Sequence, residues 1–186
     1  MDKKPSMLQF TMTYGAILGG LSIVSSLLMY LFGYMPTASV SRMVLLALLK
    51  FAVVIVFVST GMKNYRDKIL GGSITFFQAL YVGLLILIFE TVLSGFYDLV
   101  FNLYIDPGYA NKMVEAFKSS FFTWMNLAGT PQKNIDELMD MIEKSQSNSS
   151  PLPNFFSNIY STFIFGTILS LIVASFTKKN QNPVSR

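Results

Sequence analysis

Two charged residues lie inside long apolar stretches of this sequence, and they are the strongest candidates for chemistry. Lys50 interrupts the apolar stretch 43–62, and Glu90 lies near the end of the stretch that begins at Ile74. With a helical rise of about 1.5 Å per residue, both side chains fall at nearly the same depth in a hydrocarbon core roughly 30 Å thick. We therefore expect an ion pair between Lys50 and Glu90; the alternative is a path for an ion or a proton.

Other acidic residues are explained without a functional site. Asp98 lies beyond the apolar core, where a solvated or helix-end carboxylate is expected, and Asp106 with Pro107 ends the segment that follows. A later cluster comprises Asp136, Glu137, Asp140 and Glu143. Carboxylate oxygens suit hard cations, but the spacing of this cluster matches no calcium loop, so it predicts a solvated helix face. We expect no metal site and no cofactor.

The composition indicates a membrane protein. Of the 186 residues, 52% are hydrophobic and 13% are charged, compared with roughly 25% charged residues in soluble domains. The chain has no cysteine and no histidine, so the nucleophilic and zinc-binding motifs built on these residues are excluded. Basic residues flank the apolar stretches and form no patch, which indicates a lipid bilayer, and not nucleic acid, as the partner.

Four apolar stretches of membrane length predict four transmembrane helices, at about 10–32, 43–62, 74–96 and 155–177. The first is longer than the apolar region of a cleavable signal peptide, so we expect it to remain as a helix. We interpret 1–186 as a single membrane domain. The predicted fold class is an all-α integral membrane protein with an extramembrane αα-hairpin between the third and fourth transmembrane helices.

Small residues recur at helical spacing in the first and last of these helices. Such ridges let neighbouring helices approach closely. The first ridge comprises Gly15, Gly19, Ser22 and Ser26; the second comprises Thr162, Gly166, Ser170 and Ala174. We expect the two ridges to face each other within one chain, and the alternative is that the first ridge joins two copies of the chain.

The segment 107–150 differs from the rest of the chain. Its first half has an amphipathic pattern with an aromatic face that includes Phe117, Phe121 and Trp124, and Gly129 ends this pattern. Thr130 and Pro131 are suited to begin a second helix. We expect an αα-hairpin that lies on the membrane or against the end of the helix bundle.

A group of short motifs resembles a known family. These motifs are the RD pair, the GG pair, the ITFFQAL stretch and the later YIDPGYANKM stretch, in which the marker residues are Arg66, Asp67, Gly71, Gly72, Gln78, Asp106 and Pro107. Their order and spacing resemble the domain of unknown function 4199 family. The resemblance implies a small bacterial multi-pass membrane protein of four helices, with a helical segment before the last span. It implies no activity.

The distribution of lysine and arginine predicts the orientation in the membrane. Most basic residues near helix ends fall on the side of the two termini and of the loop at Lys63 to Lys68, whereas the loop between the first two helices has only Arg42. Under the positive-inside rule, both termini are cytoplasmic and the insert 107–150 lies on the outer side of the inner membrane.

Three functions are consistent with this pattern. The first is a non-enzymatic protein that is structural or accessory to a membrane complex, with a membrane protein or a second copy as its partner. The second is a subunit of a small transporter or channel that uses Lys50 and Glu90. The third is a membrane enzyme, which we do not favour because the acid and base groups are accompanied by no nucleophile or metal cluster. We expect no catalytic residue.

Overall fold

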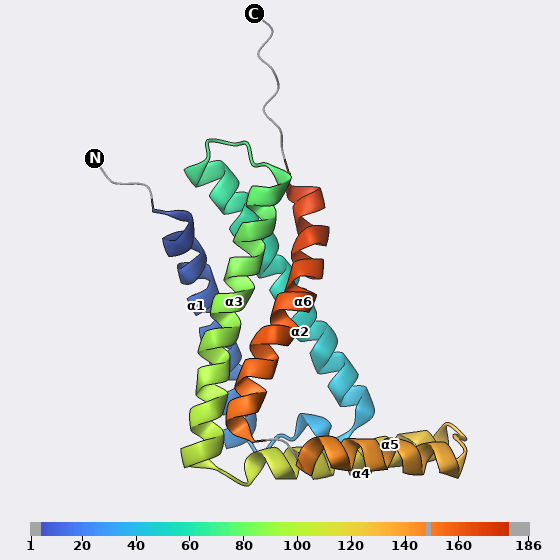
Figure 1. Ribbon diagram of the computed structural model, residues 1–186. Coiled ribbons are helices and arrows are strands. Elements are labelled where there is room, and N and C mark those ends of the chain that lie inside the picture. The colour runs from blue at the N-terminus through green and yellow to red at the C-terminus, as the bar shows by residue number, and fades with distance from the viewer. Residues whose placement is uncertain (1–4, 148–149, 179–186) are drawn as a thin grey trace, which may run out of the picture. The chain divides into compact units, whose positions relative to one another are not determined.

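The computed structural model describes residues 5–147 and 150–178, and this part of the chain consists of helices joined by turns, without strands (Figure 1). Four long helices are joined by short turns and by two shorter helices. The elements in chain order are α1 (Met7–Leu31), η1 (Pro36–Ala38), α2 (Val40–Asn64), η2 (Tyr65–Ile69), α3 (Phe76–Val100), η3 (Phe101–Ile105), α4 (Tyr109–Leu127), α5 (Gln132–Ser147) and α6 (Pro151–Thr177).

Four of the helical stretches are long and apolar enough to cross a membrane: Met7–Leu31, Val40–Ile69, Phe76–Ile105 and Pro151–Thr177. Two of them exceed the predicted spans because π-helical turns, η2 and η3, continue α2 and α3. The last helix begins at Pro151, earlier than the predicted 155, because proline is tolerated in the first turn of a helix.

The chain forms two compact units, and each of the four long helices contributes to both. The bundle unit consists of the described residues up to Val24, Phe51–Gly95 and those from Ser157 onward. The insert unit consists of Ser25–Lys50 and Phe96–Phe156.

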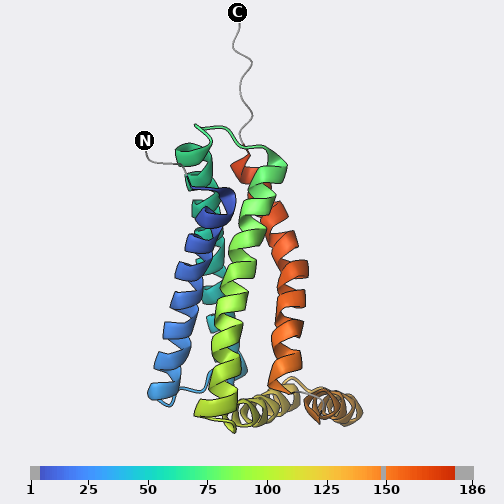
Figure 2. The ribbon, with the colours of Figure 1, turned by 60° about the vertical axis from the view of Figure 1, so that its left-hand side comes forward.

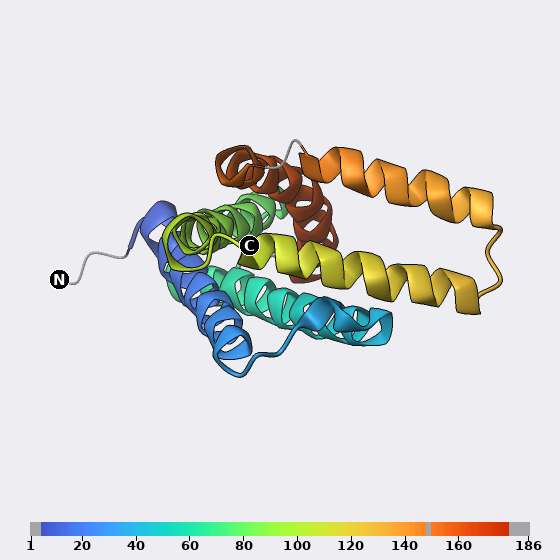
Figure 3. The same ribbon diagram turned by 90° about the horizontal axis from the view of Figure 1, so that it is seen from below.

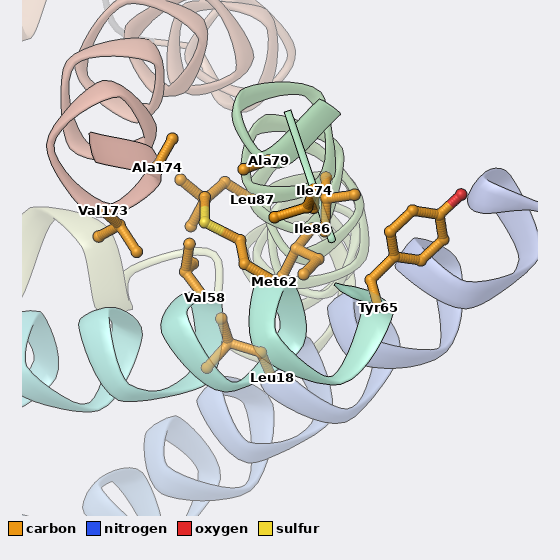
Figure 4. Close-up of a cluster of buried hydrophobic side chains, with 11 residues drawn as sticks. Leu18, Val58, Met62, Tyr65, Ile74, Ala79, Ile86, Leu87, Val173 and Ala174 are labelled. Atoms are coloured by element: carbon orange, nitrogen blue, oxygen red, sulfur yellow. The ribbon is translucent and has the colours of Figure 1, made fainter. Parts of the chain in front are cut away.

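The core of the bundle unit is a cluster of apolar side chains from all four long helices (Figure 4). Leu18 of α1, Val58 and Met62 of α2, Ile86 of α3 and Val173 of α6 are among its members, and each is at most 6% exposed. Their side chains point toward one another between the helices (Figure 4). These side chains fill the space between the helices of this unit.

In the bundle unit, α3 lies between α1 and α6 (Figures 1 and 2). A Cβ atom added to Gly15 of α1 would fall 2.5 Å from Cβ of Phe89, and one added to Gly166 of α6 would fall 3.1 Å from Cδ1 of Leu87. Phe89 and Leu87 both belong to α3. The prediction that the two small-residue ridges face each other is therefore wrong, because each ridge packs against α3.

The insert unit is organised around aromatic contacts. The Phe101 ring packs against Tyr30, Tyr97 and Tyr109, with centroids 4.9–5.7 Å apart. The 3₁₀ turn η1 contacts α4, and the Ser120 hydroxyl donates to the Thr37 carbonyl at 2.8 Å. Helices α4 and α5 contact each other and run side by side (Figure 3). Gly129 connects them with φ +71°, a conformation that favours glycine.

The packing of α1 on α3 predicts a position-specific effect of an added methyl group. Gly15→Ala places Cβ 2.5 Å from Phe89 Cβ and 2.8 Å from the Ile86 carbonyl oxygen, so we expect destabilisation of about 1–3 kcal/mol. Gly20→Ala on the same helix is the matched control, because its Cβ would meet no atom within 4 Å. Thermal unfolding in detergent measures the difference, and equal midpoints for the two variants would contradict this packing.

Candidate functional site

Glu90 is the buried acidic residue of the bundle unit. It lies on α3 and is 8% exposed. The Ser22 hydroxyl of α1 donates to Glu90 Oε1 at 2.9 Å, and the neighbouring Thr91 hydroxyl donates to Oε2 at 3.2 Å. The Thr91 hydroxyl is also 2.9 Å from the Thr162 hydroxyl of α6. One carboxylate thus connects three helices through hydroxyl groups.

Small residues on α1 and α6 position these hydroxyl groups. A Cβ at Gly19 would fall 3.3 Å from the Glu90 carbonyl oxygen, so α1 passes close to α3 just before Ser22. Gly166 likewise contacts Leu87 about one helical turn after Thr162. The small residues let α1 and α6 approach α3 closely. This close approach brings the hydroxyl groups of Ser22 and Thr162 within hydrogen-bonding distance of the polar groups on α3.

The hydrogen-bond network can exist in two arrangements. A hydroxyl group carries a single proton, so Thr91 donates either to Glu90 or to Thr162 at any one time. When Thr91 donates to Glu90, the Thr162 hydroxyl can donate to Thr91 in turn. Within the bundle unit as described, the partners of Glu90 are hydroxyl groups and not a cation. The site can therefore hold a carboxylate, or a protonated carboxyl group that donates to one of the same oxygens.

Lys50, the predicted partner of Glu90, is exposed and lies on the part of α2 that belongs to the insert unit. Glu90 belongs to the bundle unit. The ion pair between them stays a prediction.

Of the other residues in the small-residue ridges, Ser170 and Ala174 pack in the bundle unit and Ser26 belongs to the insert unit. Ser170 and Ala174 are fully buried in the bundle unit, and a Cβ at Gly83 of α3 would fall 2.8 Å from the Ser170 hydroxyl oxygen. Ser26 is half-buried on the part of α1 that belongs to the insert unit. The ridge of α1 thus runs through both units.

The RD pair connects the end of α2 to the end of α6. Arg66 pairs with Asp67 through two contacts, Nε to Oδ1 at 2.7 Å and Nη2 to Oδ2 at 3.0 Å. Its Nη1 atom donates to the Thr177 carbonyl at 3.3 Å, one of the carbonyl groups that a helix end leaves without a helical partner. Arg66 therefore stabilises the end of α6.

The GG pair and Gln78 shape the start of α3. Gly71 and Gly72 have φ angles of +74° and +100°, which side chains disfavour. The Thr75 hydroxyl accepts the Gln78 backbone N–H at 3.3 Å, and Gln78 Oε1 accepts the Thr75 N–H at 3.0 Å. This is a capping box, and its T-x-x-Q spacing is visible in the sequence.

Asp106 and Pro107 belong to the insert unit, at the turn into α4. Asp106 Oδ1 accepts the Gly108 backbone N–H at 3.1 Å, and Oδ2 accepts from Lys112 Nζ at 3.2 Å. Burial raises the pKa of the nearby Tyr109 hydroxyl, and the proximity of Tyr30 and Asp106 raises it further. Asp98 is exposed near the end of α3.

The acidic residues of α5 are exposed, and three of them engage local partners. Lys133 pairs with Glu137 at 3.9 Å, and Lys144 pairs with Asp140, each one helical turn away. Gln132 donates to Asp136 at 2.8 Å. Among residues 5–147 and 150–178, no group of three or more acidic side chains is arranged to hold a metal ion.

Four helices that are long and apolar enough to cross a membrane, one of which carries a buried carboxylate, are consistent with a multi-pass membrane protein. The family model described as "Protein of unknown function (DUF4199)" matches residues 13–179, so the chain belongs to that family. The resemblance found in the RD, GG, QA and IDP motifs is thereby confirmed. No curated protein and no solved structure matches the chain.

Proposed function

We propose that this chain is a non-enzymatic multi-pass protein of the bacterial inner membrane, with a structural or accessory role in a membrane complex. The observation that carries the proposal is the outward placement of large apolar side chains along helices of membrane length. Phe176 and Phe165 on α6 are 86% and 70% exposed, and Leu45 on α2 is 67% exposed. Exposure of apolar side chains to lipid costs no free energy, whereas their exposure to water does.

The charges support one orientation. In the bundle unit Lys63, Lys68 and Lys178 are exposed near the ends of α2 and α6, whereas the connection 32–39 has no basic residue and Arg42 follows it in the first turn of α2. Under the positive-inside rule, the first group is cytoplasmic, as are both termini. The segment 107–150 is then an extramembrane hairpin of α4 and α5 on the outer side.

The surface of α4 supports the accessory role. The side chains of Phe122, Trp124 and Leu127 are 42%, 49% and 84% exposed on the last turns of α4. Aromatic residues are enriched where proteins bind one another, and exposed apolar clusters mark contact sites. The partner is a membrane protein or a second copy of the chain.

Because the chain contains no cysteine, single cysteines test the orientation and the partner together. A membrane-impermeant maleimide that carries a photo-crosslinker is added to spheroplasts with Leu127→Cys or, as the control, Lys68→Cys. We expect reaction at residue 127 alone before lysis, and on illumination a discrete adduct of higher mass. Reaction at residue 68 alone would contradict the orientation. Reaction at 127 without an adduct to any protein would contradict the accessory role.

A second candidate function is favoured by Glu90. Ionisable residues within membrane-spanning helices are costly and often mark ion or proton pathways. The Glu90 carboxyl group is buried among Ser22, Thr91 and Thr162, whose hydroxyl groups can exchange donor and acceptor roles. We propose as the alternative that copies of the chain assemble into a small transporter or channel that carries protons through Glu90, with Lys50 as a second charged group.

Proton flux into liposomes that contain the purified protein tests this alternative. If it holds, the parent shows flux above that of empty liposomes and Glu90→Gln abolishes it, because glutamine can accept from one hydroxyl group and donate to the other but does not release a proton. Glu115→Gln is the control, since Glu115 is an exposed acid on α4. Parent flux equal to that of empty liposomes, or unchanged flux in Glu90→Gln, would rule out this function.

A further inference from the structure

The insert unit contains a cavity of about 390 Å³ beside the connection between α1 and α2, within the size range of small-ligand sites. Tyr30, Tyr34 and Tyr109 line it, together with Asp106 and Lys112. The rings of Tyr30 and Tyr109 pack edge to face, with centroids 5.3 Å apart. The lining thus combines aromatic rings with one carboxylate and one ammonium group.

The two charged groups of this cavity are held differently. Asp106 is oriented by the Gly108 backbone N–H at 3.1 Å, and its side chain is 18% exposed. Lys112 reaches Asp106 at 3.2 Å, but its side chain is 58% exposed and long, so it loses entropy when it is held in place. Asp106 is therefore a pre-oriented acceptor, and Lys112 is a cation that another ammonium group can displace.

One tyrosine of the cavity already interacts with a cation. The guanidinium carbon of Arg42 lies 5.9 Å from the centroid of the Tyr34 ring, within the range of a cation–π contact. Aromatic rings beside a carboxylate are the usual means by which proteins recognise organic ammonium groups. Lys112, once displaced from Asp106, remains at the edge of the cavity to attract an anionic group.

We propose that this cavity binds a compact zwitterion that carries an organic ammonium group close to a phosphate. The ammonium group takes the place of Lys112 at Asp106, among Tyr30, Tyr34 and Tyr109, and the phosphate binds Lys112. This chemistry has two sources, the headgroup of a zwitterionic phospholipid and a free phosphocholine-like solute. The site is separate from Glu90 and does not depend on either proposed function.

Calorimetric titration of the full-length protein in detergent tests the site with phosphocholine and with tetramethylammonium. We expect the parent to bind both, and Asp106→Asn to weaken both by roughly tenfold or more, since it removes the charge that attracts the ammonium group. Glu115→Gln is the control, because it removes the same charge from α4 outside the cavity and leaves both affinities unchanged. Lys112→Gln weakens phosphocholine but not tetramethylammonium, because only the first carries a phosphate.

Tyr34→Leu provides a second route if Asp106→Asn does not fold, and we expect the same loss of both ligands. Native mass spectrometry of the purified parent separates the two sources. A retained phospholipid with a choline or ethanolamine headgroup, lost in Asp106→Asn or in Tyr34→Leu, assigns the site to lipid, whereas binding of soluble phosphocholine without retained lipid assigns it to a solute. The proposal is overturned if the parent neither binds these ligands nor retains such a lipid, or if neither variant binds or retains them more weakly than Glu115→Gln.

Discussion

The hydrogen bonds to the Glu90 carboxyl group are the interaction on which the bundle unit depends. A carboxylate buried among apolar helices is costly unless its oxygens are hydrogen-bonded. Here the partners come from Ser22 on α1 and Thr91 on α3, and Thr91 also contacts Thr162 on α6. The polar network and the apolar packing therefore require the same close approach of α1 and α6 to α3.

If these helices cross a membrane, as we propose, the polar network contributes a larger share of the helix association than it would in a soluble protein. Between helices in a bilayer, apolar burial gives little driving force, because lipid tails are as apolar as leucine side chains. Close packing at small residues and hydrogen bonds between helices must then supply the association. Gly15 and Gly166 provide the close packing through their contacts with α3. Ser22 and Thr162 provide the hydrogen bonds between helices.

The four long helices could be predicted from the sequence because a membrane-length apolar stretch has few alternative structures. The small-residue ridges were also visible, but their mutual contact was predicted wrongly. Helical periodicity identifies the packed face of a helix and does not identify the helix that packs against it. Here Gly83, a small residue of α3, packs against α6, and Gly15 of α1 packs against α3.

The site was only partly predictable for the same reason. A glutamate inside an apolar stretch was evident, and the nearest opposite charge in a neighbouring stretch, Lys50, was the natural partner to expect. The hydroxyl groups of Ser22 and Thr162 are 68 and 71 positions away from their partners, and serine and threonine are too common in membrane helices to be singled out. Local motifs were more informative, since the turn at Asp106 and the glycine pair are determined by neighbouring residues.

The most direct test of the central interaction is a double-mutant cycle between Ser22→Ala and Glu90→Leu, measured by unfolding in detergent. If Ser22 acts through Glu90, Ser22→Ala costs about 1.5–3 kcal/mol in the parent and little in the Glu90→Leu background. Thr13→Ala is the control on α1, because its exposed hydroxyl bonds only the Gln9 carbonyl of the same helix, and it should be additive with Glu90→Leu. An equal cost of Ser22→Ala in both backgrounds would contradict the account.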